Sequence, residues 1–186
     1  MKFSVVALTL FVAGSAFSGT DWITETGAHE GGFVRLGLWG VPGASSETTF
    51  PSGRKVSLDD VGSMARLQVG WSVVPRVALH INLLDVLVPL DNGINAFTWG
   101  PGITAYAPVG NFFVTAVYGY SIVQMDGDKS GTGSLWYIGL GKEFQLSKCN
   151  GLGLMATWEH GSWEDKDSHQ TWKESGPGLQ FTWTYN

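Results

Sequence analysis

The chain has 186 residues and a formal net charge of −5, and only 15% of its residues are charged. Water-soluble domains usually carry about 25% charged residues, so much of this surface is expected to avoid water. A membrane-spanning helix needs roughly 18 consecutive apolar residues, and no internal segment reaches that length, which excludes a helical membrane protein. The negative net charge argues against a nucleic acid partner.

The first 18 residues are expected to be a secretory signal peptide. Lys2 supplies a positive charge, residues 4–13 form a short apolar core, and either 14–16 or 16–18, with small residues at its ends, suits cleavage. A buried helix or a first strand is the alternative for this segment. This signal predicts an exported chain. We expect a periplasmic lead-in over 19–30 and, from the patterns described next, a barrel domain over 31–186.

Behind this leader, eight segments alternate between apolar residues and small or polar ones. In the last segment, Leu179, Phe181, Trp183 and Tyr185 share one parity, and Gly, Gln and Thr residues occupy the other. Successive side chains of a strand point to opposite faces, so this alternation predicts strands with one apolar face. The predicted strands are 33–40, 64–73, 77–84, 97–106, 112–122, 136–143, 152–159 and 178–185.

The connections between these strands alternate between short and long. Short turns are predicted at 74–76, 108–111 and 146–151. Long polar loops are predicted at 41–63, 85–94, 124–133 and 160–176. This rhythm is typical of a membrane barrel with tight periplasmic turns and longer outer loops. Pro101 falls inside the fourth strand and requires a bulge or a local gap in pairing there. The single cysteine, Cys149, cannot form an internal disulfide and is expected to be an unpaired thiol in the third turn.

A soluble barrel of the lipocalin kind is the rival fold, with apolar residues inside and charged residues outside. The polar parity of this chain consists mainly of Gly, Ser and Thr, which suit the narrow, side-chain-filled interior of an eight-stranded barrel. Aromatic residues near the strand ends fit the girdles found at membrane interfaces, although Trp39 has the inward parity: Trp39, Trp71, Trp99, Trp136, Trp158 and Tyr185. The sequence therefore predicts an all-β fold, an eight-stranded antiparallel up-and-down transmembrane β-barrel.

The pattern over 31–186 resembles the small eight-stranded bacterial outer-membrane barrels of the OmpX and OmpA-transmembrane type. Gly178, Phe181, Trp183 and Tyr185 look like the C-terminal signal read by the barrel-assembly machinery, although Asn186 follows the last aromatic residue. The segments 141–153 and 184–186 are also similar to a group of outer-membrane-like barrels. The resemblance implies a Gram-negative outer-membrane location and supplies no activity.

Charged and amide side chains occur at the inward parity of the predicted barrel. With both termini in the periplasm, Arg35 and Glu143 lie near the periplasmic end, and Arg66 and Glu159 near the outer end. A charge in a narrow lumen needs a partner because its desolvation is costly. We therefore expect an Arg/Glu/Gln network in two layers that fills the lumen, completed by Gln68, His80, Asn82 and Gln180. A gated path for protons or ions is the alternative.

An alternative catalytic site lies in the predicted fourth long loop. His160, Ser162 and Glu174 resemble the His-x-Ser plus downstream Glu arrangement of PagL, a lipid A deacylase built on an eight-stranded barrel. The resemblance implies His160 as base, Ser162 as nucleophile and Glu174 as the group that orients the imidazole. The chain departs from that family at Trp163, where the family has Asn.

An alternative metal site lies in the predicted third long loop. Asp126, Asp128 and Ser130 have the spacing that opens a calcium loop. Tyr137 occupies the place where that pattern needs a carboxylate, so an ordinary polar loop is preferred. Carboxylates of the fourth loop could share divalent cations with lipopolysaccharide phosphates, and solvated side chains are the preferred interpretation there as well: Glu164, Asp165 and Asp167.

The function predicted from these patterns is that of an outer-membrane barrel with a filled lumen and a structural or surface-interaction role exerted through its outer loops. A lipid A hydrolase of the PagL kind and a narrow channel or small-ligand binder are the alternatives, and an enzyme is not expected. The expected partners are outer-membrane lipid, lipopolysaccharide and, during biogenesis, the barrel-assembly machinery. We expect a monomer without a cofactor.

Overall fold

The computed structural model describes residues 31–49, 52, 55–89, 95–108, 110–124, 130–147, 149–165, 167 and 169–186. The predicted signal peptide and the lead-in over 19–30 lie outside the described residues. The described part contains β1 (Gly31–Thr49), β2 (Lys55–Val74), β3 (Val77–Pro89), β4 (Asn95–Tyr106), β5 (Phe112–Gln124), β6 (Ser130–Gln145), β7 (Asn150–Asp165) and β8 (Thr171–Tyr185). No helix in this part of the chain is long and apolar enough to cross a membrane.

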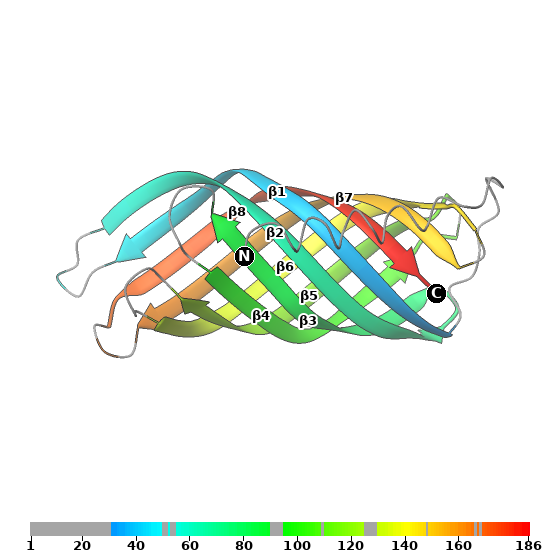
Figure 1. Ribbon diagram of the computed structural model, residues 1–186, viewed down its shortest axis with the longest axis horizontal. Helices are drawn as coiled ribbons and strands as arrows, with labels where there is room; N and C mark the ends of the chain where they lie inside the picture. Colours follow the sequence, from blue (N-terminus) through cyan, green and yellow to red (C-terminus); the bar gives the residue numbers. More distant parts are fainter. Residues whose placement is uncertain are drawn as a thin grey trace, which may run out of the picture.

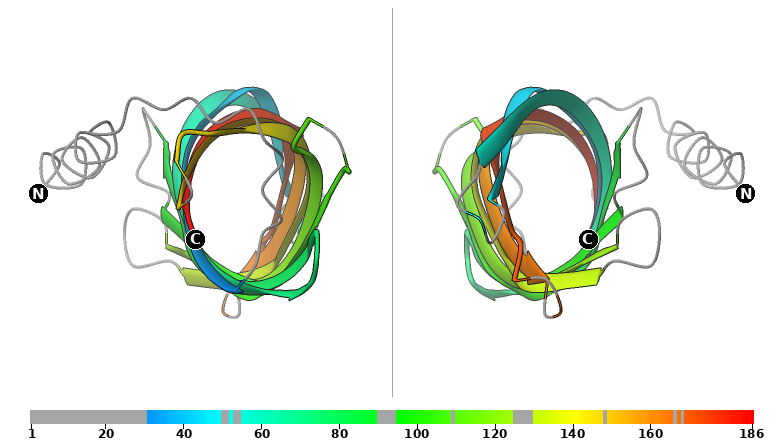
Figure 2. Two further views of the ribbon diagram at one scale, coloured as in Figure 1. Left: turned by 90° about the vertical axis from the view of Figure 1, so that its right-hand side faces the viewer. Right: turned by 90° about the vertical axis from the view of Figure 1, so that its left-hand side faces the viewer.

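The eight strands close into one antiparallel barrel, because each strand pairs with its sequence neighbours and β1 also pairs with β8. Figure 2 shows the closed ring from both ends. The C-terminus and the start of β1 lie at one end of the barrel, on the right in Figure 1, and the β1–β2 and β7–β8 hairpins reach out at the other end. The predicted all-β, eight-stranded antiparallel barrel is confirmed.

The turns at the C-terminal end are short, as predicted. Pro75 and Arg76 join β2 to β3, and Arg76 adopts a φ of 76°. The β6–β7 turn contains Cys149, which is exposed and has a free thiol. The backbone carbonyl of Cys149 accepts a hydrogen bond of 2.9 Å from the backbone N–H of Asn186. This bond ties the last residue of the chain to the neighbouring turn.

The long loops predicted at the opposite end are wrong in extent, because much of each predicted loop is strand. β1 and β2 remain paired up to Thr49 and Lys55, and β7 and β8 remain paired up to Glu164 and Thr171. Backbone pairing needs no alternation of hydrophobicity, and alternation arises only where the two faces of a strand meet different surroundings. The polar strand extensions therefore read as loops in the sequence.

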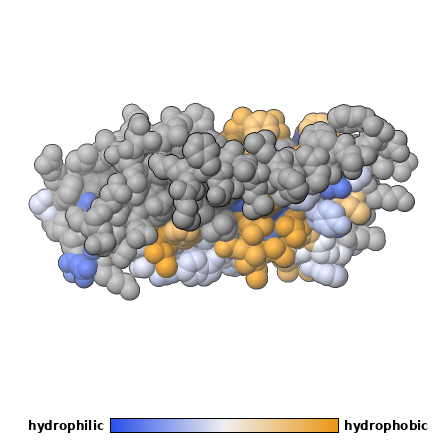
Figure 3. Space-filling model, in the orientation of Figure 1, coloured by the Kyte–Doolittle hydropathy of each residue, from blue (hydrophilic) through white to orange (hydrophobic). Residues whose placement is uncertain are grey.

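The two faces of the strands differ in the way the sequence predicts. The outward face carries exposed large apolar residues, and we call this set the apolar belt: Leu38, Val69, Trp71, Val73, Val74, Leu79, Ile81, Leu83, Phe97, Trp99, Ile103, Phe112, Val114, Tyr118, Tyr120, Ile138, Leu140, Phe144, Leu154, Trp158, Leu179, Phe181 and Tyr185. On the side shown in Figure 3, hydrophobic residues gather over the middle of the barrel and strongly hydrophilic ones lie toward its ends. The soluble alternative, with apolar residues inside and polar residues outside, does not fit this distribution.

Pro101 occupies the interior of β4, where it is exposed on the outward face. β4 pairs with β5 on both sides of Gly100 and Pro101, but these two residues make no ladder pair with the described part of β5. Proline has no N–H to donate, so a local gap in pairing accommodates it.

Candidate functional site in the barrel lumen

The eight residues predicted to line the lumen are all buried on the inward face of the barrel: Arg35, Arg66, Gln68, His80, Asn82, Glu143, Glu159 and Gln180. Glycines on the same face make room for them. A Cβ on Gly37 would overlap the amide of Gln180, and a Cβ on Gly102 would overlap the imidazole of His80. The small residues of the inward parity are therefore what allows large polar side chains to fill the barrel.

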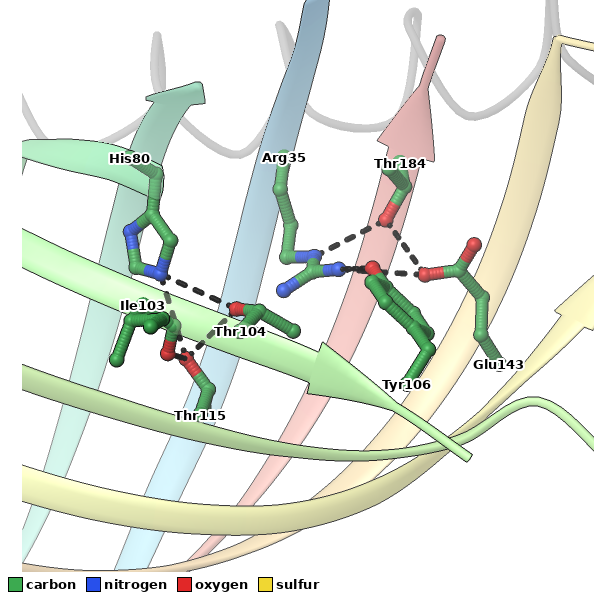
Figure 4. Close-up of polar contacts among 8 residues, drawn as sticks. All are labelled: Arg35, His80, Ile103, Thr104, Tyr106, Thr115, Glu143 and Thr184. Atoms are coloured by element: carbon green, nitrogen blue, oxygen red, sulfur yellow. Dashed lines mark hydrogen bonds and ion pairs between the residues drawn. The ribbon is translucent and has the colours of Figure 1, made fainter. Parts of the chain in front are cut away.

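The cluster near the short turns is centred on Arg35 of β1. Its Nε donates a hydrogen bond of 3.1 Å to the Thr184 hydroxyl, and its Nη2 lies 3.4 Å from Glu143 Oε2. Nη2 also donates to the Tyr106 hydroxyl, and Thr184 donates a bond of 3.1 Å to Glu143 Oε2. Figure 4 shows these four side chains converging from β1, β4, β6 and β8. We call them the inner cluster.

Two buried aromatic rings pack against the inner cluster. The Arg35 guanidinium carbon lies 5.0 Å from the centroid of the Phe113 ring and 5.5 Å from that of Phe33. Arg35 and Glu143 are each only 1% exposed. An ion pair so well shielded from water has strong mutual attraction and also a large desolvation cost, so it depends on its additional hydrogen bonds.

The second cluster is centred on Arg66 of β2. Its Nη2 lies 3.2 Å from Glu159 Oε1, and its Nη1 donates a hydrogen bond of 3.1 Å to Gln180 Oε1. The guanidinium carbon lies 3.7 Å from the centroid of the Tyr137 ring, whose hydroxyl accepts a bond of 2.5 Å from Gln68 Nε2. We call these five residues the outer cluster. It carries one Arg and one Glu, as does the inner cluster.

Further buried polar contacts lie outside the two clusters. His80 Nε2 lies 3.1 Å from the Thr104 hydroxyl, which donates a bond of 2.9 Å to the hydroxyl of Thr115 (Figure 4). Asn82 Nδ2 donates a bond of 3.3 Å to the backbone carbonyl of Thr98. The Asn82 bond lies beside the register shift between β3 and β4, where regular ladder pairing is interrupted.

Two buried tryptophans lie on the inward face near the hairpin that joins β7 to β8. Trp163 and Trp172 oppose each other in the β7–β8 ladder and are 5% and 6% exposed. Each indole lies where a glycine leaves space, because a Cβ on Gly161 would overlap Trp163 and a Cβ on Gly131 would overlap Trp172. The inner cluster, the outer cluster and the two indoles thus occupy the lumen at successive levels between its ends.

The alternative catalytic residues do not come together. His160 and Ser162 lie on the outward face of β7, where the centroid of the His160 ring lies 5.8 Å from that of Trp136 of β6, with the two rings tilted by 39°. Glu174 opposes Gly161 in the ladder, so it belongs to the inward face. A carboxylate on the other side of the sheet cannot orient the imidazole as the PagL-like arrangement requires.

The alternative metal residues are only partly described. Asp126 and Asp128 lie outside the described residues, and Ser130 is the first residue of β6. Of the fourth-loop carboxylates, Glu164 is exposed and lies 3.3 Å from His169 Nδ1, whereas Asp165 is buried on the inward face. No group of three or more His, Cys, Asp and Glu side chains with metal-binding geometry occurs in the described ranges.

The prediction missed several residues that complete the lumen clusters: Tyr106, Tyr137, Thr184, Phe33, Phe113, Trp163 and Trp172. A signal for some of them is present in the sequence. Tyr106 and Tyr137 fall on the inward parity among small residues, and a buried tyrosine hydroxyl usually finds a hydrogen-bond partner. Pairing either hydroxyl with a specific arginine or glutamine requires the register of non-adjacent strands.

Comparison with known proteins finds similarity at the level of solved structures alone. No family model and no curated protein matches the sequence. Neisserial surface protein A aligns over 83% of this chain and 98% of its own, with 12% identity and a TM-score of 0.48. The outer membrane protein OprG from Pseudomonas aeruginosa aligns over 86% and 97%, with 11% identity and a TM-score of 0.48. Ail, the attachment invasion locus protein of Yersinia pestis, aligns over 82% and 99%, with 12% identity and a TM-score of 0.43.

Proposed function

We propose that this protein is a monomeric bacterial outer-membrane barrel with a side-chain-filled lumen, whose role is structural or is exerted through surface contacts of its outer hairpins. The observation that carries the proposal is the combination of an exposed apolar belt with an interior of buried ion pairs. Soluble monomers rarely expose continuous apolar patches larger than a few hundred Å². A barrel surrounded by lipid requires this distribution.

Aromatic residues mark the two borders of the proposed membrane zone. Trp71 and Tyr185 lie near the short turns, and the ring centroid of Trp183 lies 6.2 Å from that of Tyr185. On the other side, the ring centroids of Trp99 and Tyr120 lie 5.0 Å apart with the rings tilted by 59°, and Tyr118, Trp136 and Trp158 extend this outer tier over β5, β6 and β7. The side chain of Trp39, predicted for the same role, lies outside the described residues. Tyr and Trp are enriched at membrane interfaces because they combine an apolar ring with a polar group.

The outer hairpins supply the proposed contact surface. β1 and β2 are 19 and 20 residues long, whereas a tilted membrane strand needs about 9–11. Beyond the outer tier, the outward residues change from apolar to polar, as in Ser134 and Ser162. We propose that these extensions contact lipopolysaccharide or other surface molecules. The short turns and termini would then face the periplasm, where the assembly machinery would read β8.

Heat-modifiable migration tests the proposed location and fold. In detergent, the unheated protein is expected to migrate differently from the boiled protein, with a β-rich circular dichroism spectrum, because a closed barrel resists detergent unfolding. The same protein without detergent should aggregate, since the apolar belt would face water. A folded, soluble monomer in detergent-free buffer would refute the membrane assignment.

Planar-bilayer recording tests the filled lumen. The inserted wild-type barrel is expected to show no large, steady conductance, because the inner cluster, the outer cluster and the two indoles occupy the lumen. Trp163→Ala with Trp172→Ala removes the indoles alone and should leave the current low, since both arginine clusters persist. Large, steady currents from the wild type would support the alternative of a channel.

A further inference from the structure

Lys142 is an exception in the apolar surface. Its strand neighbours on the outward face are Leu140 and Phe144, and its ladder neighbours are Phe112 of β5 and Leu154 of β7. Between the short turns and the outer aromatic tier, it is the one Asp, Glu, Lys or Arg among the outward side chains that the structure describes. A charge on a lipid-facing surface is costly and is usually associated with function.

Two phenylalanine rings adjoin the Lys142 ammonium, Phe112 from the neighbouring strand β5 and Phe144 from two residues further along β6. The Nζ atom lies 5.0 Å from the centroid of the Phe112 ring and 5.1 Å from that of Phe144. These rings are about half exposed, at 48% and 49%. Ring faces attract an ammonium within about 6 Å, which restrains its position on the surface.

The ammonium still requires acceptors, because it has three N–H donors and aromatic faces are poor substitutes for oxygen. Leu154 and Leu140, which adjoin it, supply none. The adjacent carboxylate, that of Glu143, points to the other face of the sheet, where it pairs with Arg35. The described protein surface around Lys142 therefore offers a restrained cation without a facing anion.

We propose that Lys142, restrained by the Phe112 and Phe144 rings, binds the phosphate group of a phospholipid in the leaflet next to the short turns, an inference that rests on the proposed membrane location. The backbone N–H of Glu143 donates a 3.0 Å bond to the carbonyl of Asn111 in the β4–β5 turn, so Lys142 lies close to the end of the barrel. A lysine near that end extends its ammonium toward the headgroups while its methylene chain stays in the apolar zone. Phosphate supplies the anionic oxygens, and the two rings border the acyl chains.

Native mass spectrometry of the folded barrel in detergent tests the site. The barrel is titrated with dioleoylphosphatidylglycerol and, separately, with dioleoylglycerol, which lacks the phosphate. The wild type is expected to retain the phospholipid in preference to the diacylglycerol. Lys142→Met should weaken phospholipid retention about five-fold, the effect of one lysine near an anionic lipid surface, and Lys142→Arg should restore most of it. Lys173→Met is the matched control, because Lys173 is an exposed outward lysine of β8 beyond the outer tier.

The outcomes separate this site from the proposed membrane location. Equal retention by the wild type and Lys142→Met, an equal loss in Lys173→Met, or equal retention of the two lipids would overturn the site. Each variant is also checked for heat-modifiable migration, so that lipid retention is compared only between folded barrels. A barrel that stays folded and soluble without detergent would instead overturn the membrane location on which the site depends.

Discussion

Arg35→Met is expected to lower the free energy of unfolding by about 3–5 kcal/mol, the usual cost of removing one partner of a buried ion pair. Methionine keeps a long, unbranched side chain at this position but leaves the buried Glu143 carboxylate without the arginine cation. The hydrogen bonds from Arg35 to Thr184 and Tyr106 are lost at the same time. Urea unfolding in lipid vesicles, followed by tryptophan fluorescence, measures the change.

A double-mutant cycle separates the charge from the loss of packing. Arg35→Met with Glu143→Gln should be more stable than Arg35→Met alone, because the uncompensated charge is then absent. Lys173→Met, at an exposed position, serves as the control and should change stability by less than about 0.5 kcal/mol. A cost below about 1 kcal/mol for Arg35→Met would show that the inner cluster contributes little to the stability of the barrel.

Phe181→Arg is expected to cost about 2–4 kcal/mol, the penalty for a cation near the middle of the lipid-facing surface of a barrel. Phe181 is 63% exposed and opposes Leu154 of β7 and Leu38 of β1, both also exposed. All three residues lie within the apolar belt. Unfolding from lipid vesicles measures the penalty.

Two neighbouring positions on β8 supply the controls for Phe181→Arg. Tyr185→Arg lies at the end of the strand and should cost only about 0–1 kcal/mol, because an interface tolerates the charge. Thr182→Arg lies on the inward face at 3% exposure and should destabilise by crowding the lumen. Equal, small effects at Phe181 and Tyr185 would contradict the proposed membrane zone.

The sequence predicted which residues face the lumen better than where the strands end. The parity of Arg35, Arg66, Glu143 and Glu159 follows from the alternation within each strand, and all four are buried inside the barrel. The predicted ends of the strands are wrong, because β1 continues to Thr49 through residues that do not alternate. Alternation reports the surroundings of a strand and therefore ends before backbone pairing does.

The candidate catalytic set illustrates a second limit of sequence patterns. His160 and Ser162 share the outward parity of β7, but Glu174 precedes the alternating part of β8, so the pattern assigned it no face. The ladder places it opposite Gly161, on the inward side. Which residues of two strands face each other depends on their register, and a shift of one residue exchanges the faces.

The sequence by itself determined the class of fold, the closed order of eight antiparallel strands and the division into an apolar outside and a polar inside. The two faces follow from local geometry, because side chains alternate along every strand, and the antiparallel order follows from the short turns that join neighbouring strands. Only the tertiary structure decided that Arg35 contacts Tyr106 and Thr184, that Arg66 lies over Tyr137, and that the Lys142 ammonium lies near two phenylalanine rings. Those contacts depend on the stagger with which the strands close the barrel and on side-chain conformations set by packing, which no single segment encodes.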